Sequence, residues 1–409
     1  MDITVRPITD DEITEFRSVI NRTFGFDLPE DDEAGIERFR ATFPLDRTVA
    51  AFESGRIVGT GGGFPFDLTI PGGAAPMSGT TVITVRPTHR RRGVLRRMMQ
   101  AHLDDARQRG EPFAGLWASE AVIYGRFGYG AAADLHDTSI DARTTSFLGD
   151  PPPGTVRFIE GNEINEFIPA IYDRIRPTRP GMLSRSKAWW EHRRFHDPQE
   201  WREGASSRRW VVYFDEHGAA AGYVAFRQKE KFEGGNFDST VSVIELMAET
   251  DDAHSSLWRF LFSVDLFPNI SYWNVPVDDP LPWKVTNRRA VQRKRSETLW
   301  LRVLDVEAAL TARSYLSEGG IVLGIRDDFY PDLAGSYELV VGPGGAGCSR
   351  TDAEPDVTLD SADLGSIYLG GHAPTTLAAA GRVSGSPEAL ATADALFHWN
   401  VAPWCPEVF

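Results

Sequence analysis

The pattern of hydrophobic and polar positions between residues 81 and 110 predicts a strand, a basic turn and a helix. Residues 81–85 form a β-branched run, and Pro87 cannot donate to a strand ladder, so we expect the strand to end by Arg86. Apolar residues then recur at helical spacing, and Gly110 provides a C-terminal stop. The apolar positions of this helix are Leu95, Met98, Met99, Leu103 and Ala106. The basic turn is therefore a helix N-terminus.

Similar patterns on both sides of this unit predict a mixed sheet. Strands precede the helix, and another strand follows it, so two neighbouring strands should flank the helix N-terminus. The predicted elements are a strand at residues 3–7, a helix at 10–24, antiparallel strands at 49–52, 56–63 and 66–70, and a strand at 113–118.

Three domains are predicted, at residues 1–150, 151–295 and 296–409. Residues 151–154 (Pro-Pro-Pro-Gly) form the clearest linker in the chain, because polyproline is stiff and extended. No glycine-rich phosphate loop interrupts the middle segment. Residues 342–347 match the glycine spacing of a dinucleotide-binding loop, but no helical pattern follows them, so we expect a hairpin loop there.

The basic turn has the features of an anion site. Arg90, Arg91 and Arg92 precede Gly93, where the helix begins with unpaired N–H groups and the positive end of its dipole. Gly93 allows a phosphate oxygen to approach the backbone, and neighbouring guanidinium groups can add charge-assisted bonds. Taken alone, an arginine triplet is equally compatible with a solvated basic turn or a nucleic-acid patch.

Composition narrows the class of protein. The chain of 409 residues has 43 basic and 58 acidic residues and a formal charge of −15, which argues against general binding to nucleic acid or anionic membranes and favours cationic partners. No run approaches the roughly 20 apolar residues of a membrane span, and no signal pattern is evident at the start. Two cysteines make neither a disulfide scaffold nor a metal cluster. We therefore expect a cytoplasmic protein without a metal.

Two sequence blocks carry a resemblance to a known family. In residues 85–95, Arg90 and Gly93 match the pyrophosphate loop of the GNAT N-acetyltransferase superfamily, whereas Leu95 stands where a second small residue is usual. Residues 116–130 read Leu-Trp-Ala-Ser-Glu-Ala-Val-Ile-Tyr-Gly-Arg-Phe-Gly-Tyr-Gly. Together with their spacing and the final Phe409, these blocks resemble the enhanced intracellular survival (Eis) family of acetyltransferases over essentially the whole chain.

The resemblance implies an α+β protein with two tandem GNAT-like mixed-sheet domains, the second degenerate and without cofactor, followed by a sterol-carrier-like α/β domain. It implies acetyl-CoA as cosubstrate and assembly as a homohexamer. The backbone of Ile83 and Val85 would bond the pantetheine arm. The other implied cofactor residues are Arg90, Arg91, Gly93, Val94 and Ser119.

Acetyl transfer to an amine needs an acid for the leaving thiolate, and a phenol is suitable because its ordinary pKa of ~10 is near that of an alkyl thiol. From the residues alone, Tyr124 and Tyr129 are equal candidates, and each could instead be core packing. The resemblance assigns the acid to Tyr124. It assigns the base to the α-carboxylate of Phe409, although chain termini are often frayed.

Acidic residues near the cleft are candidates for binding an ammonium group of the substrate. Residues 25–35 form an acidic stretch, from which Phe26 and Asp27 are predicted to contact substrate, although a solvated loop is the plainer interpretation. Glu407 is a further candidate. Cys405 is expected to be a packed thiol, since no histidine partner is evident nearby.

These residues and the resemblance predict an acetyl-CoA-dependent N-acetyltransferase for primary amines of polycationic small molecules. The resemblance implies aminoglycosides, modified at one or several positions, and lysine side chains of proteins are a second acceptor class. The competing hypothesis is a non-catalytic protein that binds an apolar ligand and keeps a vestigial acetyltransferase domain. Such a protein would be expected to lose the arginine loop or Tyr124, and both are present.

Overall fold

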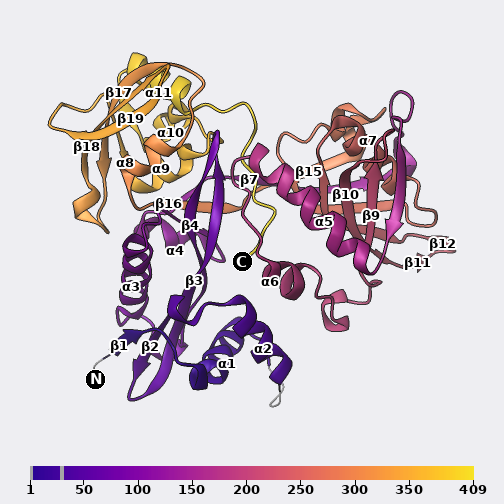
Figure 1. The fold of residues 1–409 in the computed structure, drawn as a ribbon, viewed down its shortest axis with the longest axis horizontal. Helices are drawn as coiled ribbons and strands as arrows, with labels where there is room; N and C mark the ends of the chain where they lie inside the picture. Colours follow the sequence, from indigo (N-terminus) through magenta and orange to yellow (C-terminus); the bar gives the residue numbers. More distant parts are fainter. Residues whose placement is uncertain (1–2, 28–31) are drawn as a thin grey trace.

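The computed structural model describes residues 3–27 and 32–409, in three large mixed sheets with helices packed against them (Figure 1). In the first sheet, alternate residues of β2 face opposite sides, so Ala50 and Phe52 pack with α1 (Ile13–Phe24), while Val49 and Ala51 pack with α3 (Val94–Gln108). In sheet order its strands are β1 (Ile3–Arg6), β2 (Thr48–Glu53), β3 (Arg56–Ile70), β4 (Gly73–Val85), β5 (Phe113–Trp117), β16 (Leu299–Val303) and β6 (Gly130–Ala131).

The second sheet has its own core, built from α5 (Asn162–Ile175) and α7 (Asp251–Phe262) packed against it. The helix α6 (Lys187–Trp189) continues into a turn of π-helix at Trp190–Arg194. The strands of the second sheet, in the order in which they lie side by side, are β15 (Val291–Glu297), β7 (Asp134–Asp141), β14 (Asn269–Pro276), β13 (Thr240–Ala248), β10 (Ala220–Lys229), β9 (Arg209–Phe214) and β8 (Thr155–Ile159). A small ribbon, β11 (Phe232–Glu233) and β12 (Asn236–Phe237), extends from it.

The third sheet is accompanied by four helices of the C-terminal part of the chain, α8 (Val306–Ala312), α9 (Ser361–Tyr368), α10 (Pro374–Ala379) and α11 (Pro387–Phe397). In sheet order its strands are β19 (Gly345–Thr351), β18 (Gly335–Gly342), β17 (Gly319–Arg326), β20 (Val357–Asp360) and β21 (Ser384–Gly385). The turn between β18 and β19 is the predicted hairpin, because the two strands pair antiparallel up to Gly342 and Gly345. The predicted α+β class is confirmed.

The predicted strand, turn and helix at residues 81–110 are also confirmed. The strand β4 ends at Val85, a short 3-10 turn covers Pro87–His89, and α3 runs from Val94 to Gln108. Gly110 adopts a φ of 73°, the left-handed conformation of a helix stop.

The sheets do not follow the predicted domain boundaries. Strand β7 belongs to the predicted first domain by sequence but pairs within the second sheet. Strand β16 belongs to the predicted third domain by sequence but lies between β5 and β6 in the first sheet. The two crossings run side by side, since Ala133 N–H donates to the carbonyl of Leu299 at 3.2 Å and Thr298 N–H donates to that of Ala133 at 2.8 Å. The polyproline segment lies inside the second domain, where Tyr213 hydroxyl donates to the carbonyl of Pro153.

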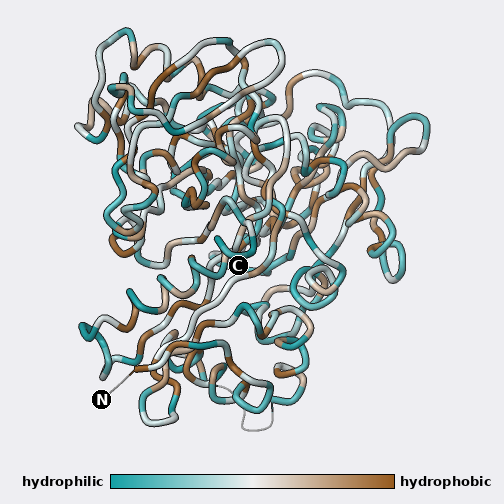
Figure 2. The backbone as a smooth tube through the Cα atoms, turned by 60° about the vertical axis from the view of Figure 1, so that its left-hand side comes forward, coloured by the Kyte–Doolittle hydropathy of each residue, from teal (hydrophilic) through white to brown (hydrophobic). Residues whose placement is uncertain are grey.

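The chain ends between the first and second domains, near the middle of the molecule (Figure 1). Hydrophobic segments lie mainly in the interior of the molecule, and the peripheral loops are largely hydrophilic (Figure 2). Across the described residues, every helix is too short or too polar to cross a membrane. Those residues also bring together no group of three or more His, Cys, Asp or Glu side chains that could hold a metal ion.

Candidate active site

The two parallel strands of the first sheet separate after a short paired segment. Strand β4 pairs with β5 only where Met77–Gly79 lie opposite Phe113–Gly115. Beyond Gly79, β4 continues to Val85 while β5 ends at Trp117, and within the described chain no strand fills the space between them. This opening exposes strand backbone groups that a ligand can bond.

A bulge in β4 marks the same place. The register with β3 pairs Thr60 with Thr84 but Gly62 with Thr81, so two residues of β4, Val82 and Ile83, lie opposite one residue of β3. Val82 has a φ of 48°, which a β-branched side chain rarely adopts. The Thr60 hydroxyl donates to the carbonyl of Val82 at 2.9 Å and holds this conformation. Strained backbone of this kind clusters at functional sites.

The basic turn borders a cavity of about 740 Å³ at one end of the opening. Its lining includes Arg90, Arg91, Gly93 and Val94 beside the start of α3, together with Ile83 and Val85 of β4. Gly93 precedes the first helical residue with a φ of 76°, and the 15 residues of α3 direct the positive end of the helix dipole into the cavity.

The three arginines of the turn have different environments. Arg92 forms an ion pair with Glu53, which His89 also contacts through Nε2 at 2.8 Å. Arg90 and Arg91 line the cavity and form no ion pair with any other described residue. Their guanidinium groups are therefore available to an anionic ligand.

A second, smaller cavity of about 320 Å³ adjoins the first. The two share Phe24, Ile83, Ser119 and Tyr124 as lining residues. The other residues around the smaller cavity are Thr80, Thr81, Val82, Trp117, Ala118, Val408 and Phe409.

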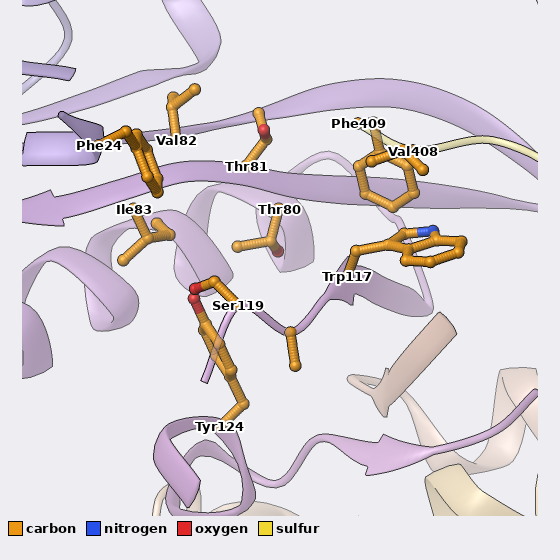
Figure 3. A pocket seen from close by; sticks show the side chains of 11 residues that line it. Phe24, Thr80, Thr81, Val82, Ile83, Trp117, Ser119, Tyr124, Val408 and Phe409 are labelled. Carbon is orange, nitrogen blue, oxygen red and sulfur yellow. The ribbon is translucent and has the colours of Figure 1, made fainter. Parts of the chain in front are cut away.

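Tyr124 lies on the wall common to both cavities. It ends the short helix α4 (Ala121–Tyr124), which follows β5, and its hydroxyl points to that of Ser119 (Figure 3). The side chain is 6% exposed. Burial raises the pKa of the Tyr124 phenol, and its hydrogen bond with Ser119 opposes this rise. The phenol is therefore protonated at neutral pH and able to donate a proton.

The other candidate tyrosine is part of the core. Tyr129 is fully buried, and its hydroxyl lies 2.8 Å from that of Thr80, which also contacts His102 Nε2 at 2.8 Å. Burial raises the pKa of Tyr129 and lowers that of His102 to about 4, so both groups are neutral. Sequence reasoning missed His102, which occupies a buried position of α3 among apolar neighbours.

Phe409 reaches the smaller cavity from the far end of the chain (Figure 3). Its ring packs against Phe66 of β3 with a centroid distance of 5.1 Å. The tail before it, residues 403–407, is buried throughout. Cys405 is the packed thiol that the sequence predicts: it donates to the carbonyl of Glu407, and burial raises its pKa to about 12.

The predicted substrate residues do not gather at the smaller cavity. Phe26 and Asp27 are exposed and lie outside its lining, which Phe24 joins instead. Among the described lining residues, none has a carboxylate side chain. Glu407 also lies outside that lining: it is 2% exposed and forms an ion pair with Arg185, because the tail turns its side chain into the second domain.

The acidic stretch that follows Phe26 is partly helical. Asp32 caps α2 (Glu33–Thr42) by accepting a bond from Gly35 N–H at 3.0 Å, and it also pairs with Arg17. Its carboxylate is therefore engaged in structure. The acidic residues Glu30 and Asp31 lie outside the described residues.

Comparisons with known proteins agree with this architecture. Models of the acetyltransferase (GNAT) domain match residues 4–132 and 181–303, and a sterol carrier protein domain model matches residues 306–406. An uncharacterised N-acetyltransferase from Streptomyces avermitilis is 37% identical, with 100% of both chains covered. N-acetyltransferase Eis from Mycobacterium tuberculosis is 36% identical over 84% of this chain and 85% of its own. The crystal structure of Eis1 from Mycobacterium abscessus covers 99% of this chain and 100% of its own, at 33% identity and a TM-score of 0.87.

The domain models and the relatives identify an N-acetyltransferase of the GNAT class, and the divided strands and the basic helix N-terminus lie in the first of its GNAT domains. The chain belongs to the Eis family of these enzymes, with two GNAT domains and a sterol-carrier-like third domain. The resemblance and the fold predicted from the sequence are therefore confirmed.

Proposed function

We propose that this enzyme transfers an acetyl group from acetyl-CoA to a primary amine of a polycationic substrate, with aminoglycosides as the expected class. The observation that carries this proposal is the position of Tyr124 between two cavities, one bordered by free arginines and the other by Phe409. The residues around the larger cavity suit acetyl-CoA, because its pyrophosphate matches the helix N-terminus of α3.

Acetyl-CoA supplies the thioester when bound, and the chain supplies the proton transfers around it. Arg90, Arg91 and the backbone at Gly93 and Val94 would hold the pyrophosphate, and the strand backbone at Ile83 and Val85 would hold the pantetheine arm. Ser119 would orient the phenol of Tyr124. A strand N–H near the bulge would polarise the thioester carbonyl.

The reaction requires three proton movements. The α-carboxylate of Phe409 takes a proton from the substrate ammonium, whose nitrogen then bonds to the carbonyl carbon while the carbon–sulfur bond breaks. Tyr124 donates its proton to the departing thiolate, and the acetylated nitrogen loses its second proton, which restores the Tyr124 phenol and leaves a neutral amide. A free α-carboxylate has an ordinary pKa of ~3.3–3.7, so this base works through burial or through a bridging water.

The acceptor is attracted by charge and by aromatic faces. The formal charge of −15 favours cations over the whole molecule. The faces of Phe24, Trp117 and Phe409 border the smaller cavity, and an ammonium group gains roughly 0.5–2 kcal/mol over such a ring. Asp27, three residues after Phe24 in the sequence, stays a predicted substrate contact.

Free-thiol release from acetyl-CoA across an amine panel tests the proposal. The panel contains aminoglycosides, polyamines, lysine peptides and small arylamines, each assayed with the intact chain and with a chain lacking Val408 and Phe409. We expect turnover on multi-amine antibiotics, loss of turnover in the shortened chain, and equal acetyl-CoA affinity in both. Turnover confined to lysine peptides would move the function to protein acetylation. Equal activity of the shortened chain would overturn the terminal base.

We also infer from the family resemblance that the enzyme assembles as a homohexamer. Light scattering coupled to size-exclusion chromatography measures the molar mass directly. A species of six chains, each of 45.3 kDa, is the expected result, and a monomer would contradict it.

A further inference from the structure

The second domain repeats the strand, helix and strand unit that forms the cofactor opening of the first. Strands β13 and β14 are parallel neighbours joined through α7, as β4 and β5 are joined through α3. They pair only from Thr240 opposite Asn269 to Val243 opposite Tyr272. Beyond this segment β13 continues to Ala248 and β14 to Pro276, so a second opening lies between them.

The second opening lacks the features that bind a pyrophosphate. In the first domain the basic turn separates β4 from α3, whereas here only Glu249 and Thr250 separate β13 from α7. Thr250 caps the helix itself by accepting a bond from Ala253 N–H at 3.1 Å. Asp251 and Asp252 occupy the first helical turn, where they neutralise the helix dipole and repel an anion.

The chain's own tail occupies this opening. Asn274, on β14 beyond the paired segment, donates to the carbonyl of Cys405 at 3.1 Å and accepts a bond from Trp404 Nε1 at 2.7 Å. Trp404 also closes one side of the 370 Å³ cavity that remains between the ends of β13 and β14. Asn274 is 2% exposed, so this amide serves the tail alone.

On the opposite side of the opening, a buried ion cluster holds Glu407. Arg185 binds Glu407 through Nε and Glu245 of β13 through both terminal nitrogens, at 3.1 and 2.6 Å. Arg194 lies 2.6 Å from Glu245 and 3.6 Å from Glu407. The guanidinium of Arg185 stacks 3.8 Å above the ring of Tyr172. Replacing Glu407 would leave buried positive charge without its partner.

We propose that the second GNAT domain is a peptide-binding groove whose ligand is the chain's own segment 403–407, an apolar peptide with one carboxylate. The groove uses the opening that holds the pantetheine arm in a cofactor-binding GNAT domain. Its residues Arg185 and Asn274 are positioning residues, because they fix the segment that carries Phe409 into the acceptor cavity. The catalytic consequence rests on the proposed function of Phe409, whereas the binding of the segment does not.

Cys405 reports on the groove in the intact chain. In a Cys348→Ser background it is the one remaining thiol, and its burial should make it slow to react with a thiol reagent. Glu407→Gln should accelerate this reaction at least about tenfold, because a buried hydrogen bond between charged groups is lost. The control Glu338→Gln, at an exposed position of β18, should leave the rate unchanged. Equal rates of Cys405 reaction in Glu407→Gln and Glu338→Gln would contradict the proposal that the groove holds the tail segment.

Steady-state kinetics of variants in the groove distinguish loss of tail positioning from loss of folding. With Glu407→Gln and Asn274→Ala we expect kcat to fall at least about tenfold, with KM for acetyl-CoA unchanged, since the cofactor cavity lies in the first domain. Arg185→Lys, which retains the charge, should recover part of kcat relative to Arg185→Ala. A faster Cys405 reaction with unchanged kcat would support binding of the tail segment by the second domain but contradict the role of the Phe409 α-carboxylate as the base. A parallel rise in KM for acetyl-CoA would indicate general unfolding and overturn the positioning role.

A peptide supplied in trans tests the groove as a binding site. A chain shortened after Val401 should bind a fluorescent peptide with the sequence of residues 402–409, measured by anisotropy, and should recover activity with it. The same peptide with a C-terminal amide should bind equally well without restoring activity. A peptide with Gln in place of Glu407 should bind at least about tenfold more weakly. Equal binding of all three peptides would overturn the proposal, and the Cys405 experiment decides it if the shortened chain does not fold.

Discussion

At the scale of single residues, burial gives two tyrosines on neighbouring turns different properties. Tyr124 retains contact with both cavities and lies beside the hydroxyl of Ser119. Tyr129 is enclosed, and its hydroxyl lies beside that of Thr80 and lines neither cavity. The two rings are 6.2 Å apart, and their chemistry differs because one hydroxyl faces a cavity and the other faces the core.

Replacing Tyr124 with Phe removes the acid and leaves the ring in place. We expect kcat to fall by roughly 10²–10⁴, the usual range for a general acid, with little change in KM for acetyl-CoA. Because burial raises the pKa of Tyr124, loss of the protonated acid in the wild-type enzyme should occur only above pH ~10. Steady-state kinetics across pH measure both effects. The control Tyr129→Phe should lower stability by about 1 kcal/mol and change kcat only a few-fold; an unaffected kcat in Tyr124→Phe would contradict the acid role.

The arginine turn allows a second comparison between neighbouring residues. Arg90→Ala and Arg91→Ala should each raise KM for acetyl-CoA about tenfold, as expected for loss of a charge-assisted bond at a partly solvated site. Arg92→Ala should change it much less, since that guanidinium pairs with Glu53. Isothermal titration with acetyl-CoA measures the affinities. A similar loss in all three variants would mean that general positive charge, rather than specific contacts, holds the cofactor.

At the scale of elements, the strand, turn and helix at residues 81–110 could be predicted because every signal there is local. A β-branched run, a proline, a glycine and a helical apolar period all agree, and the boundaries follow from them. The fate of Glu407 could not be predicted in this way. Its partners Arg185 and Arg194 lie 222 and 213 positions earlier, and a carboxylate next to a terminus shows no sequence signal for burial.

The buried ion cluster makes the stability of the second domain depend on pH. Burial acts to raise the pKa of Glu245, but Arg185 and Arg194 outweigh it and lower the pKa to about 2 from an ordinary 4.5. Because its pKa is lowered in the folded state, the ionised Glu245 contributes its full stabilisation to the fold above pH 4.5. This contribution to the free energy of unfolding is lost as the pH falls from 4.5 towards 2.

Chemical denaturation between pH 7 and 3 measures this dependence. The wild-type chain should lose stability over that range more steeply than Glu245→Gln, in which the titrating group is absent. Glu12 provides a control, because its pKa is also lowered to about 2 but its pair with Arg6 is exposed and screened by solvent. Glu12→Gln should therefore alter the pH dependence less. Identical slopes for the wild-type chain and Glu245→Gln would show that the cluster contributes nothing in this range.

At the scale of the whole molecule, the first and second domains exchange strands. The boundary predicted after residue 150 relied on a polyproline linker, which is a local signal for a stiff segment and carries no information about strand pairing. Pairing across sequence distances as long as that between β5 and β16 depends on tertiary contacts. The number and kinds of domains could be predicted from the resemblance, but the path of the chain between them could not.

This exchange leads to a test with two fragments. A fragment of residues 1–150 lacks β16, so the edge of β5 from Phe113 to Trp117 loses its antiparallel partner, and β7 has no sheet to join. We expect this fragment to aggregate or to show no cooperative thermal transition by circular dichroism. A chain in which residues 134–297 are replaced by a short glycine–serine linker should instead retain the first sheet, because Thr298 N–H bonds to the carbonyl of Ala133 and the two ends already meet.

The shortened chain separates cofactor binding from catalysis. It keeps the basic turn, Tyr124 and the third domain, so it should unfold cooperatively and bind acetyl-CoA with an affinity close to that of the full chain. It lacks Arg185, Glu245 and Asn274, so its tail has no groove, and turnover on any amine should fall at least about tenfold. Calorimetric titration and thiol release measure the two properties on the same sample. Full activity without residues 134–297 would show that the second domain is not needed to deliver Phe409, whereas cooperative folding of residues 1–150 alone would show that β16 is dispensable for the first sheet.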